Sequence, residues 1–527
     1  MSDIYLANRE RQDLILSYVQ DILNVVSGQD ELAKTRIAAN YFRTRASRYA
    51  NLEFGASWPS WATSNLSAGT RTKNAANLVA YPSTDQSAAR NDFDTYFYGM
   101  IVNGHVNSSG EFCVDYFDTD AEFSRETRDT YMLFPTLYFK YDFTNGEEID
   151  LCLSRKTGYA PVGPAIKPNG TIRDFIPIAC YGASLDGNGV PMSVSGAEIA
   201  YKMSHNVLIT KAQAKGSQYA MQTVQEYEFL NMLFLVTFAT RDTQSVMKGC
   251  TSLNFQYTLA AAETGVTRVI VTNAQAANFV VGSIVSVGDM GSNTSNDRNN
   301  NYMHNIVDRK PITQITDLGN GNSAIYIDTG GVTFDTAVTY TLSSMPWRSG
   351  ATDGVLGSCG SPVSNSSGKY PYRLFGVECA WGQYIVLSNV VYKITAGIGK
   401  MYVTYNTVNI STSAPTENYS EVAYTVSGIG GNNGYISVMG YDANHPFVRF
   451  PIARDATSST GYADNTYGMN NNTESTNGVR EVLVGGSLTY GAYAGRFCVY
   501  VASALSTAYW YSAARLSALG ACGAAAA

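Results

Sequence analysis

The residues best able to do chemistry, cysteine and histidine, are scattered along this chain. Its eight cysteines never pair at a CxxC spacing, and its four histidines stand apart from one another and from the cysteines. Zinc sites and thiol redox centres usually place such residues a few positions apart. We therefore predict buried free thiols in a protein folded in a reducing cytoplasm, with no catalytic residue, no metal site and no cofactor.

A tyrosine-rich stretch near the C-terminus indicates binding instead. From Gly485 to Ser517 the sequence GGSLTYGAYAGRFCVYVASALSTAYWYSAARLS has no Asn, Asp, Glu, Gln, His or Lys, although Asn is frequent elsewhere. Tyr offers a wide amphipathic contact with few rotors to freeze, and small residues fill the space between such anchors. An exposed set of this kind would form an apolar contact patch. The alternative is an inert Ala- and Ser-rich edge of a β domain.

The positions between the large apolar residues of this stretch are the predicted ligand-binding positions. They are Thr489, Tyr490, Ala492, Tyr493, Cys498, Tyr500, Ser503, Thr507, Ala508, Tyr509, Tyr511 and Ser512. In GRFCVYVAS (495–503) the alternation predicts a strand whose one buried face carries Phe497, Val499 and Val501. The side chains between those three are expected to face outward.

The composition of the stretch also fits a particular mutational history. Tyr, Ser, Thr, Ala and Cys are all reached from an Asn codon by replacing its first two adenines, whereas Lys, Glu, Gln and Met are not. The latter four are absent between Gly485 and Ser517. The pattern suggests that positions once templated as Asn were rewritten.

The elements expected around this stretch are mostly strands, as abundant Gly and Tyr and only 15% charged residues indicate. Residues 4–27 have a helical apolar period, and this helix packs either within its own subunit or on identical helices of an oligomer. Residues 93–118 predict a hairpin that turns at NGH (103–105). Residues 226–249 predict a mostly buried helix that runs into a Gly.

Residues 256–345 are predicted to be a separate small all-β unit, immunoglobulin-like or a barrel. Short β-branched runs recur there about every ten residues, with turn residues between them. The polar run GSNTSNDRNNNYMHN (291–305) is expected to be an exposed loop. The style of the earlier sequence resumes after residue 345, which favours an insertion; the alternative is a linear string of three domains.

The ending of the chain resembles a known family. GGSLTYGAYAGRF and LSTAYWYSAARLS are similar to the C-terminal variable region of diversity-generating retroelement target proteins, whose lectin-like fold is shared with formylglycine-generating enzymes. Gly485, Gly486, Trp510 and Arg515 match the constant framework of that region, and Trp381 matches a second motif in YRLFGVECAWGQYIVL. Cys379 stands where the family has Asn.

The resemblance implies an α+β, β-rich, C-type-lectin-type fold that displays a hypervariable patch. The expected division is an N-terminal attachment and oligomerisation region (1–125), a lectin domain in two parts (126–255 and 346–527) and the inserted β unit (256–345). The resemblance further implies a non-enzymatic, homotrimeric phage tail fibre protein, located in the virion. It would bind a bacterial surface receptor, protein or glycan, and would contact other tail proteins.

Composition and the residues that other functions would require argue against several alternative functions. A net charge of −7 without Lys/Arg clusters argues against nucleic-acid binding, and no apolar run is long enough for membrane insertion. An enzyme of the formylglycine-generating type would need a close pair of reactive cysteines, and a calcium-dependent lectin would need clustered oxygen ligands. The remaining alternatives are a structural virion protein without a receptor role and a ligand-binding protein displayed on a bacterial surface.

Overall fold

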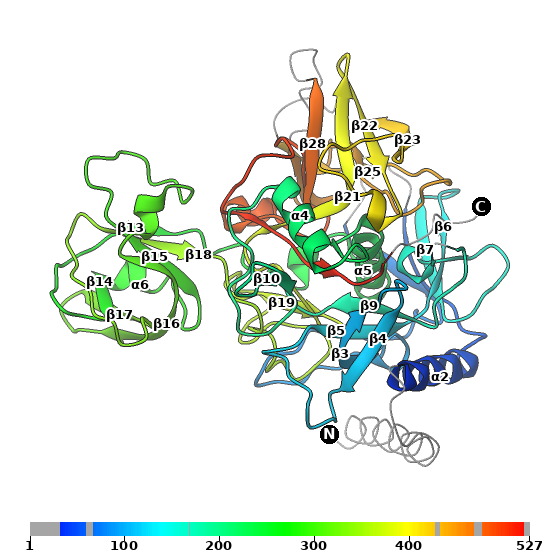
Figure 1. Ribbon diagram of the computed structural model, residues 1–527, viewed down its shortest axis with the longest axis horizontal. Coiled ribbons are helices and arrows are strands. Elements are labelled where there is room, and N and C mark those ends of the chain that lie inside the picture. Colours follow the sequence, from blue (N-terminus) through cyan, green and yellow to red (C-terminus); the bar gives the residue numbers. More distant parts are fainter. Residues whose placement is uncertain (1–31, 60–66, 168, 427–432, 468–476, 521–527) are drawn as a thin grey trace.

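The chain is rich in β-strands, and its larger lobe is built from three main sheets (Figure 1). The computed structural model describes residues 32–59, 67–167, 169–426, 433–467 and 477–520. The helix expected over residues 4–27 therefore lies outside the described residues. Among those described, no helix combines the length and the apolar character needed to cross a bilayer.

The first two sheets join segments on both sides of residue 125. One has the order β2-β1-β7-β6-β8 and the other β4-β3-β5-β9. Their strands are β1 (Phe54–Trp58), β2 (Thr70–Lys73), β3 (Met100–Val106), β4 (Phe112–Phe117), β5 (Thr130–Pro135), β6 (Tyr138–Asp142), β7 (Glu147–Cys152), β8 (Ala160–Pro161) and β9 (Phe175–Ala179). The helix α2 (Ala33–Arg48) packs on β4, β5 and β9.

The expected boundary at residue 125 is therefore wrong. β1 pairs with β7, and β3 pairs with β5, so strands from the two predicted domains hydrogen-bond directly. Phe54, Phe375, Phe497 and Leu519 belong to one hydrophobic core. The first hundred residues are therefore part of the main body, because their aromatic side chains pack into a core that they share with later segments.

The expected hairpin at NGH is also misplaced. Asn103, Gly104 and His105 lie inside β3, and the turn to β4 falls at residues 107–110, where Gly110 has φ +79°. A Cβ on Gly104 would lie 2.4 Å from the Phe112 ring. Gly104 is therefore not part of a turn. Its lack of a side chain allows the Phe112 ring of the neighbouring strand to pack against the backbone.

The third sheet lies at the top of Figure 1 and carries the tyrosine-rich stretch. Its order is β23-β22-β21-β28-β29-β27-β24, with β30 added to β21. The strands are β21 (Tyr384–Thr395), β22 (Ile398–Val403), β23 (Ser420–Val426), β24 (Asn433–Ile436), β27 (Tyr462–Tyr467), β28 (Gly478–Val484), β29 (Val499–Tyr500) and β30 (Ser512–Ala513). The short strand β29 lies between β28 and β27, in the interior of the sheet.

Short elements connect the sheets. They are α3 (Asp94–Phe97), β10 (Ser184–Leu185), β11 (Pro191–Met192), α4 (His205–Lys215), β12 (Ala220–Met221), β19 (Tyr372–Leu374), β20 (Val377–Cys379), β25 (Val438–Met439), β26 (Pro451–Ala453) and β31 (Leu516–Ser517). β12 pairs with β31, which fixes the end of the tyrosine-rich stretch to the segment just before the central helix.

The central helix α5 (Val224–Phe238) confirms the helical period seen in the sequence. A capping box begins it: the Thr223 hydroxyl accepts the Glu226 N–H, and the Glu226 carboxylate accepts the Thr223 N–H. It ends at Ala239, which has φ +49°, ten residues before the expected Gly249. The left-handed conformation of Ala239 ends the helix, and two residues later Arg241 pairs with the buried Glu147 carboxylate.

Residues 256–345 form a lobe of their own, on the left of Figure 1. The six strands have the order β13-β18-β15-β16-β17-β14. They are β13 (Gln256–Thr258), β14 (Arg268–Thr272), β15 (Ile284–Gly288), β16 (Val307–Asp317), β17 (Asn322–Ile327) and β18 (Thr341–Met345), and the short helix α6 (Asn273–Ala276) follows β14. The segment that follows β13 reaches β14 through a single bridge from Ala261 to Ile270, which links the two ends of this strand order. We call this lobe the small barrel.

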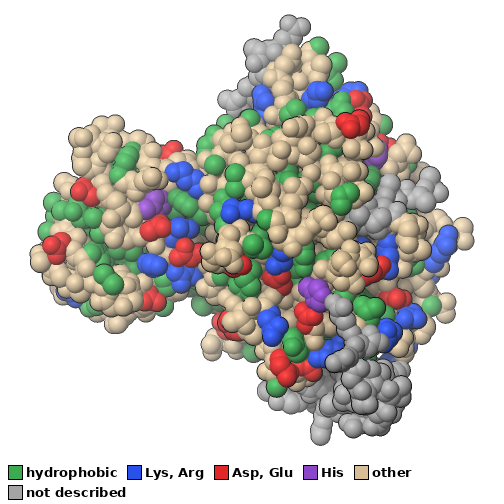
Figure 2. Space-filling view, in the orientation of Figure 1, with side chains coloured by type: hydrophobic (Ala, Val, Ile, Leu, Met, Phe, Trp, Pro, Cys, Tyr) green, Lys and Arg blue, Asp and Glu red, His purple; other side chains and the backbone are tan. Residues whose placement is uncertain are grey.

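The small barrel has its own core of Val, Ile, Leu and Phe side chains. Its first and last strands, β13 and β18, are antiparallel neighbours, so the chain enters and leaves at one end. At the junction, Glu198 of the larger lobe pairs with Arg309 and Lys310 of the barrel and with Arg348 just beyond it. Figure 2 shows acidic and basic side chains gathered between the two lobes.

Candidate functional site

The tyrosine-rich stretch begins with a turn that requires glycine. Gly485 and Gly486 follow β28 with φ values of +96° and +91°. A Cβ on Gly486 would also lie 2.5 Å from the Ala494 Cβ. The paired glycines therefore fix the start of the stretch through backbone geometry and close packing.

The predicted framework residues Trp381 and Arg515 meet in the core. The Arg515 guanidinium lies 5.0 Å from the Trp381 ring centre, donates to the Ala179 carbonyl oxygen at 2.6 Å and also donates to the Glu378 carbonyl oxygen. Trp381 Nε1 donates to the Glu378 carboxylate at 2.7 Å. Burial raises the pKa of that carboxyl to about 7. This network fixes the end of the stretch to β20.

The third framework aromatic, Trp510, lies elsewhere, against the small barrel. Its backbone N–H donates to Asn299 Oδ1 at 2.8 Å, and the Arg298 guanidinium lies 5.0 Å from its ring centre. Arg298 is buried, and the Tyr201 hydroxyl donates to its carbonyl oxygen. The expectation that residues 291–305 form a wholly exposed loop is therefore wrong in its second half, because this part of the loop packs under Trp510.

Eight of the predicted binding positions are at least partly exposed. Thr489, Ala492 and Tyr493 are exposed, and Tyr490, Thr507, Ala508, Tyr509 and Tyr511 are half-buried. Thr489, Tyr490, Ala492 and Tyr493 lie in the short helix η6 (Leu488–Tyr493), which is interrupted at Gly491. The other four lie after β29.

The other four predicted positions are buried, which corrects the expectation that they face outward. They are Cys498, Tyr500, Ser503 and Ser512. The alternation in residues 495–503 is real, but both faces of β29 are covered. Val499 and Val501 pack into one core, and Cys498 and Tyr500 pack into another on the opposite face. A strand in the interior of a sheet with a core on each side has no solvent face.

The tyrosine rings of the stretch join a larger aromatic cluster, which we call the tyrosine cluster. Its members are Tyr384, Tyr467, Tyr490, Tyr500, Tyr509 and Tyr511. Tyr467 stacks on Tyr500 at 4.9 Å between ring centres, and Tyr509 stacks on Tyr511 at 4.7 Å. Buried Tyr384 lies beneath and contacts three of the other rings.

Sequence reasoning missed Tyr384 and Tyr467, which come from β21 and β27. Their only local signal is their place at a strand end, and nothing in the sequence pairs those strands with the C-terminal stretch. Tyr493, by contrast, lies outside the cluster: its ring packs on Tyr435, and it is 42% exposed.

Three phenols of the cluster, those of Tyr490, Tyr500 and Tyr511, stay protonated at neutral pH. Burial raises the pKa of Tyr490, Tyr500 and Tyr511 above the ordinary value for tyrosine. Each hydroxyl can therefore both donate and accept a hydrogen bond. Half-buried rings with neutral hydroxyls suit contact with a partner surface better than acid–base chemistry.

The cysteine and acidic side chains form neither a reactive thiol site nor a metal site among the described residues. All seven described cysteines are free and buried, as the sequence predicts, and burial raises the pKa of Cys152 to about 11 and of Cys180 to about 12. Within the part of the chain that the structure describes, no three His, Cys, Asp or Glu side chains gather in a way that could hold a metal ion.

Comparison with known proteins does not assign this chain to a family. No protein-family model matches the chain, and a search of curated proteins finds no match either.

Proposed function

We propose that this protein is a receptor-binding protein that contacts its ligand through the half-exposed part of the tyrosine cluster. The observation that carries the proposal is that Tyr490, Tyr509 and Tyr511 are partly open to solvent while their neighbours Tyr384 and Tyr500 are buried beneath them. Such an arrangement presents large amphipathic side chains whose rotamers are already fixed, which lowers the entropy cost of binding.

The exposed small residues beside the cluster support a variable docking face. Thr489, Ala492, Thr507 and Ala508 are exposed or half-buried, so other side chains can replace them without disturbing a core. In this proposal the positions open to diversification are these four together with Tyr490, Tyr493, Tyr509 and Tyr511. Cys498, Tyr500, Ser503 and Ser512 instead support the face from below.

The rest of the proposal follows the resemblance seen in the sequence. The larger lobe would be a C-type-lectin-type fold with the small barrel inserted, and the protein a retroelement-diversified phage tail fibre protein of the virion. It would be a homotrimer attached through its N-terminal region, and it would bind a bacterial surface receptor. Two observations support this part of the proposal. Residues before 256 and after 345 share one hydrophobic core, and the Trp381 ring packs against the Arg515 guanidinium.

The test is cell binding by the triple variant Tyr490→Ala, Tyr509→Ala, Tyr511→Ala. Each lost anchor would weaken binding by about 2 kcal/mol, so the triple variant should not bind detectably while its far-UV circular dichroism stays unchanged. Tyr81→Ala is the matched control, because Tyr81 is 63% exposed and is not part of the cluster. Normal cell binding with failed particle assembly would instead support the structural virion protein.

A further inference from the structure

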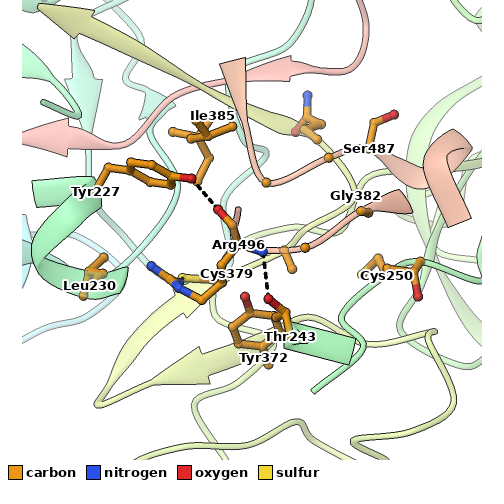
Figure 3. A pocket seen from close by; sticks show the side chains of 18 of the residues that line it. Tyr227, Leu230, Thr243, Cys250, Tyr372, Cys379, Gly382, Ile385, Ser487 and Arg496 are labelled. Atoms are coloured by element: carbon orange, nitrogen blue, oxygen red, sulfur yellow. Dashed lines mark hydrogen bonds between the residues drawn. The ribbon is translucent and has the colours of Figure 1, made fainter. Parts of the chain in front are cut away.

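A small cavity lies beneath the turn at Gly485 and Gly486, on the inner side of the tyrosine-rich stretch. Its volume is about 50 Å³, and α5, the β20–β21 connection and the residues around Arg496 contribute to its wall. Figure 3 shows Tyr227, Leu230, Tyr372 and Cys379 around the Arg496 side chain, with Gly382 and Ser487 at the opposite side. No part of the proposed docking function uses this space.

The charged side chains that line the cavity are all basic. Lys248, Arg496 and Arg515 line it, and no lining residue is acidic. Among the described residues, no carboxylate oxygen lies within 4.0 Å of the nitrogens of these three side chains. Elsewhere in the core the protein pairs such groups: buried Arg241 and Arg449 share the Glu147 carboxylate.

Arg496 has unusually few partners for a buried guanidinium. It is 6% exposed, and its oxygen partners are Asn231 Oδ1, at 3.1 Å, and the Tyr372 phenol. Its Nε has no hydrogen-bond partner within the described structure. The buried Arg373, by comparison, donates to the carbonyl oxygens of Thr352, Val355 and Gly357.

The second buried guanidinium approaches from another side. Arg515 Nη2 lies 3.7 Å from Cys379 Sγ, and Arg496 Nη1 lies 3.8 Å from the same sulfur. The Arg515 Nε also has no partner among the residues described. A cysteine sulfur is a weak hydrogen-bond acceptor, so it adds little to the two carbonyl bonds of Arg515 and to the few oxygen partners of Arg496. An uncompensated buried charge is costly unless a counterion or a strong acceptor reaches it.

We infer that this cavity binds a small monovalent anion of the chloride class, held by Arg496 and Arg515 and reached past the half-buried Lys248. One water needs roughly 10–15 Å³ of such space, so the cavity is large enough for one halide ion with a few waters. The anion neutralises the guanidinium pair directly beneath the turn at Gly485 and Gly486. It is a structural ligand and does not depend on the docking function.

Bromide is the probe, because it replaces chloride and scatters X-rays anomalously. Crystals of the full chain transferred from sodium gluconate to sodium bromide should give an anomalous peak inside the cavity, next to Arg496. In solution, 100 mM bromide should raise the thermal midpoint by about 2 °C or more over gluconate at equal ionic strength, as expected for a ligand bound only by the folded state.

The Arg496→Gln variant should lose both the peak and the salt-specific rise. Arg43→Gln, which removes a guanidinium whose side chain is 60% exposed, is the control for net charge and should keep both. If Arg496→Gln does not fold, Lys248→Gln should lower the bromide effect, and the wild-type crystal and melting curves still test the inference. A cavity without an anomalous peak, together with equal midpoints in the two salts, overturns the inference.

Discussion

At the scale of single residues, one side chain of the small barrel holds the tyrosine-rich stretch in place. Asn299 Oδ1 accepts the Trp510 N–H at 2.8 Å, while the Asn299 carbonyl oxygen accepts from Lys202 Nζ at 2.6 Å. Trp510 lies between Tyr509 and Tyr511 in sequence, so its anchoring also sets the backbone of those two tyrosines. Asn299 is thus a positioning residue for the proposed docking face.

Replacing Asn299 by Ala should therefore loosen the backbone at Trp510. Loss of one hydrogen bond of about 1 kcal/mol corresponds to about fivefold faster hydrogen exchange of the Trp510 amide, provided that exchange proceeds by local opening. Mass spectrometry of peptides covering residues 506–513 measures it. Asn293→Ala, in the exposed part of the same loop, should leave these peptides unchanged. Equal exchange in the two variants would mean that the hydrogen bond does not hold the stretch.

At the scale of elements, the central helix α5 begins with a buried carboxyl group. Glu226 accepts hydrogen bonds from the N–H and the hydroxyl of Thr223, at 2.7 and 2.9 Å. Burial nevertheless raises its pKa from 4.5 to about 7. Burial raises the pKa of Glu228 and Glu378 to about 7 in the same way. The fold therefore holds protons on these groups that the unfolded chain releases.

The sign of the pH dependence follows from that difference. Between pH 4.5 and 7 the folded protein binds more protons than the unfolded chain at these groups, so their contribution to stability falls as the pH rises and levels off above pH 7. Glu226→Gln keeps an acceptor oxygen but no longer titrates. The thermal midpoint of the variant should fall less between pH 5 and 7.5 than that of the wild type.

Glu111→Gln serves as the control for this measurement, because the Glu111 side chain is 47% exposed and lies far from α5 in the sequence. It should follow the wild-type curve. A Glu226→Gln curve parallel to the wild type would show that this carboxyl does not titrate in the expected window.

At the scale of the whole molecule, the small barrel is joined to the larger lobe but has a hydrophobic core of its own. Its hydrophobic cluster contains residues from 259 to 342 only, whereas the main core runs from Phe54 to Leu519. The two lobes meet through the ion pairs of Glu198 and through the contacts of Arg298 and Asn299 with Trp510. Ile284 and Met345 of the barrel also share a small hydrophobic cluster with Leu488 and Trp510 of the larger lobe.

The small barrel should consequently fold in isolation. A fragment of residues 254–347 is expected to give a β-type circular dichroism spectrum and a cooperative thermal transition, since its strands have a hydrophobic core of their own. A fragment of residues 32–125 should not do so, because its strands pair with β5 and β7 outside it. A non-cooperative barrel fragment would show that the barrel depends on the larger lobe.

The sequence by itself determined the local features of this protein. The apolar period fixed α5, and β-branched runs between turn residues fixed the strands of the small barrel, because these signals lie within a few residues of one another. The glycine pair at 485–486 and the abundance of Tyr after it were likewise readable from the chain alone.

Only the tertiary structure decided which tyrosines are exposed and which residues complete the site. The alternation around β29 predicts two faces but not that a core covers each of them, so Cys498 and Tyr500 are buried. Tyr384, Tyr467 and Asn299 reach the stretch from positions tens to hundreds of residues away. Burial and long-range contact depend on how sheets pack together, and a single sequence carries no local signal for that packing.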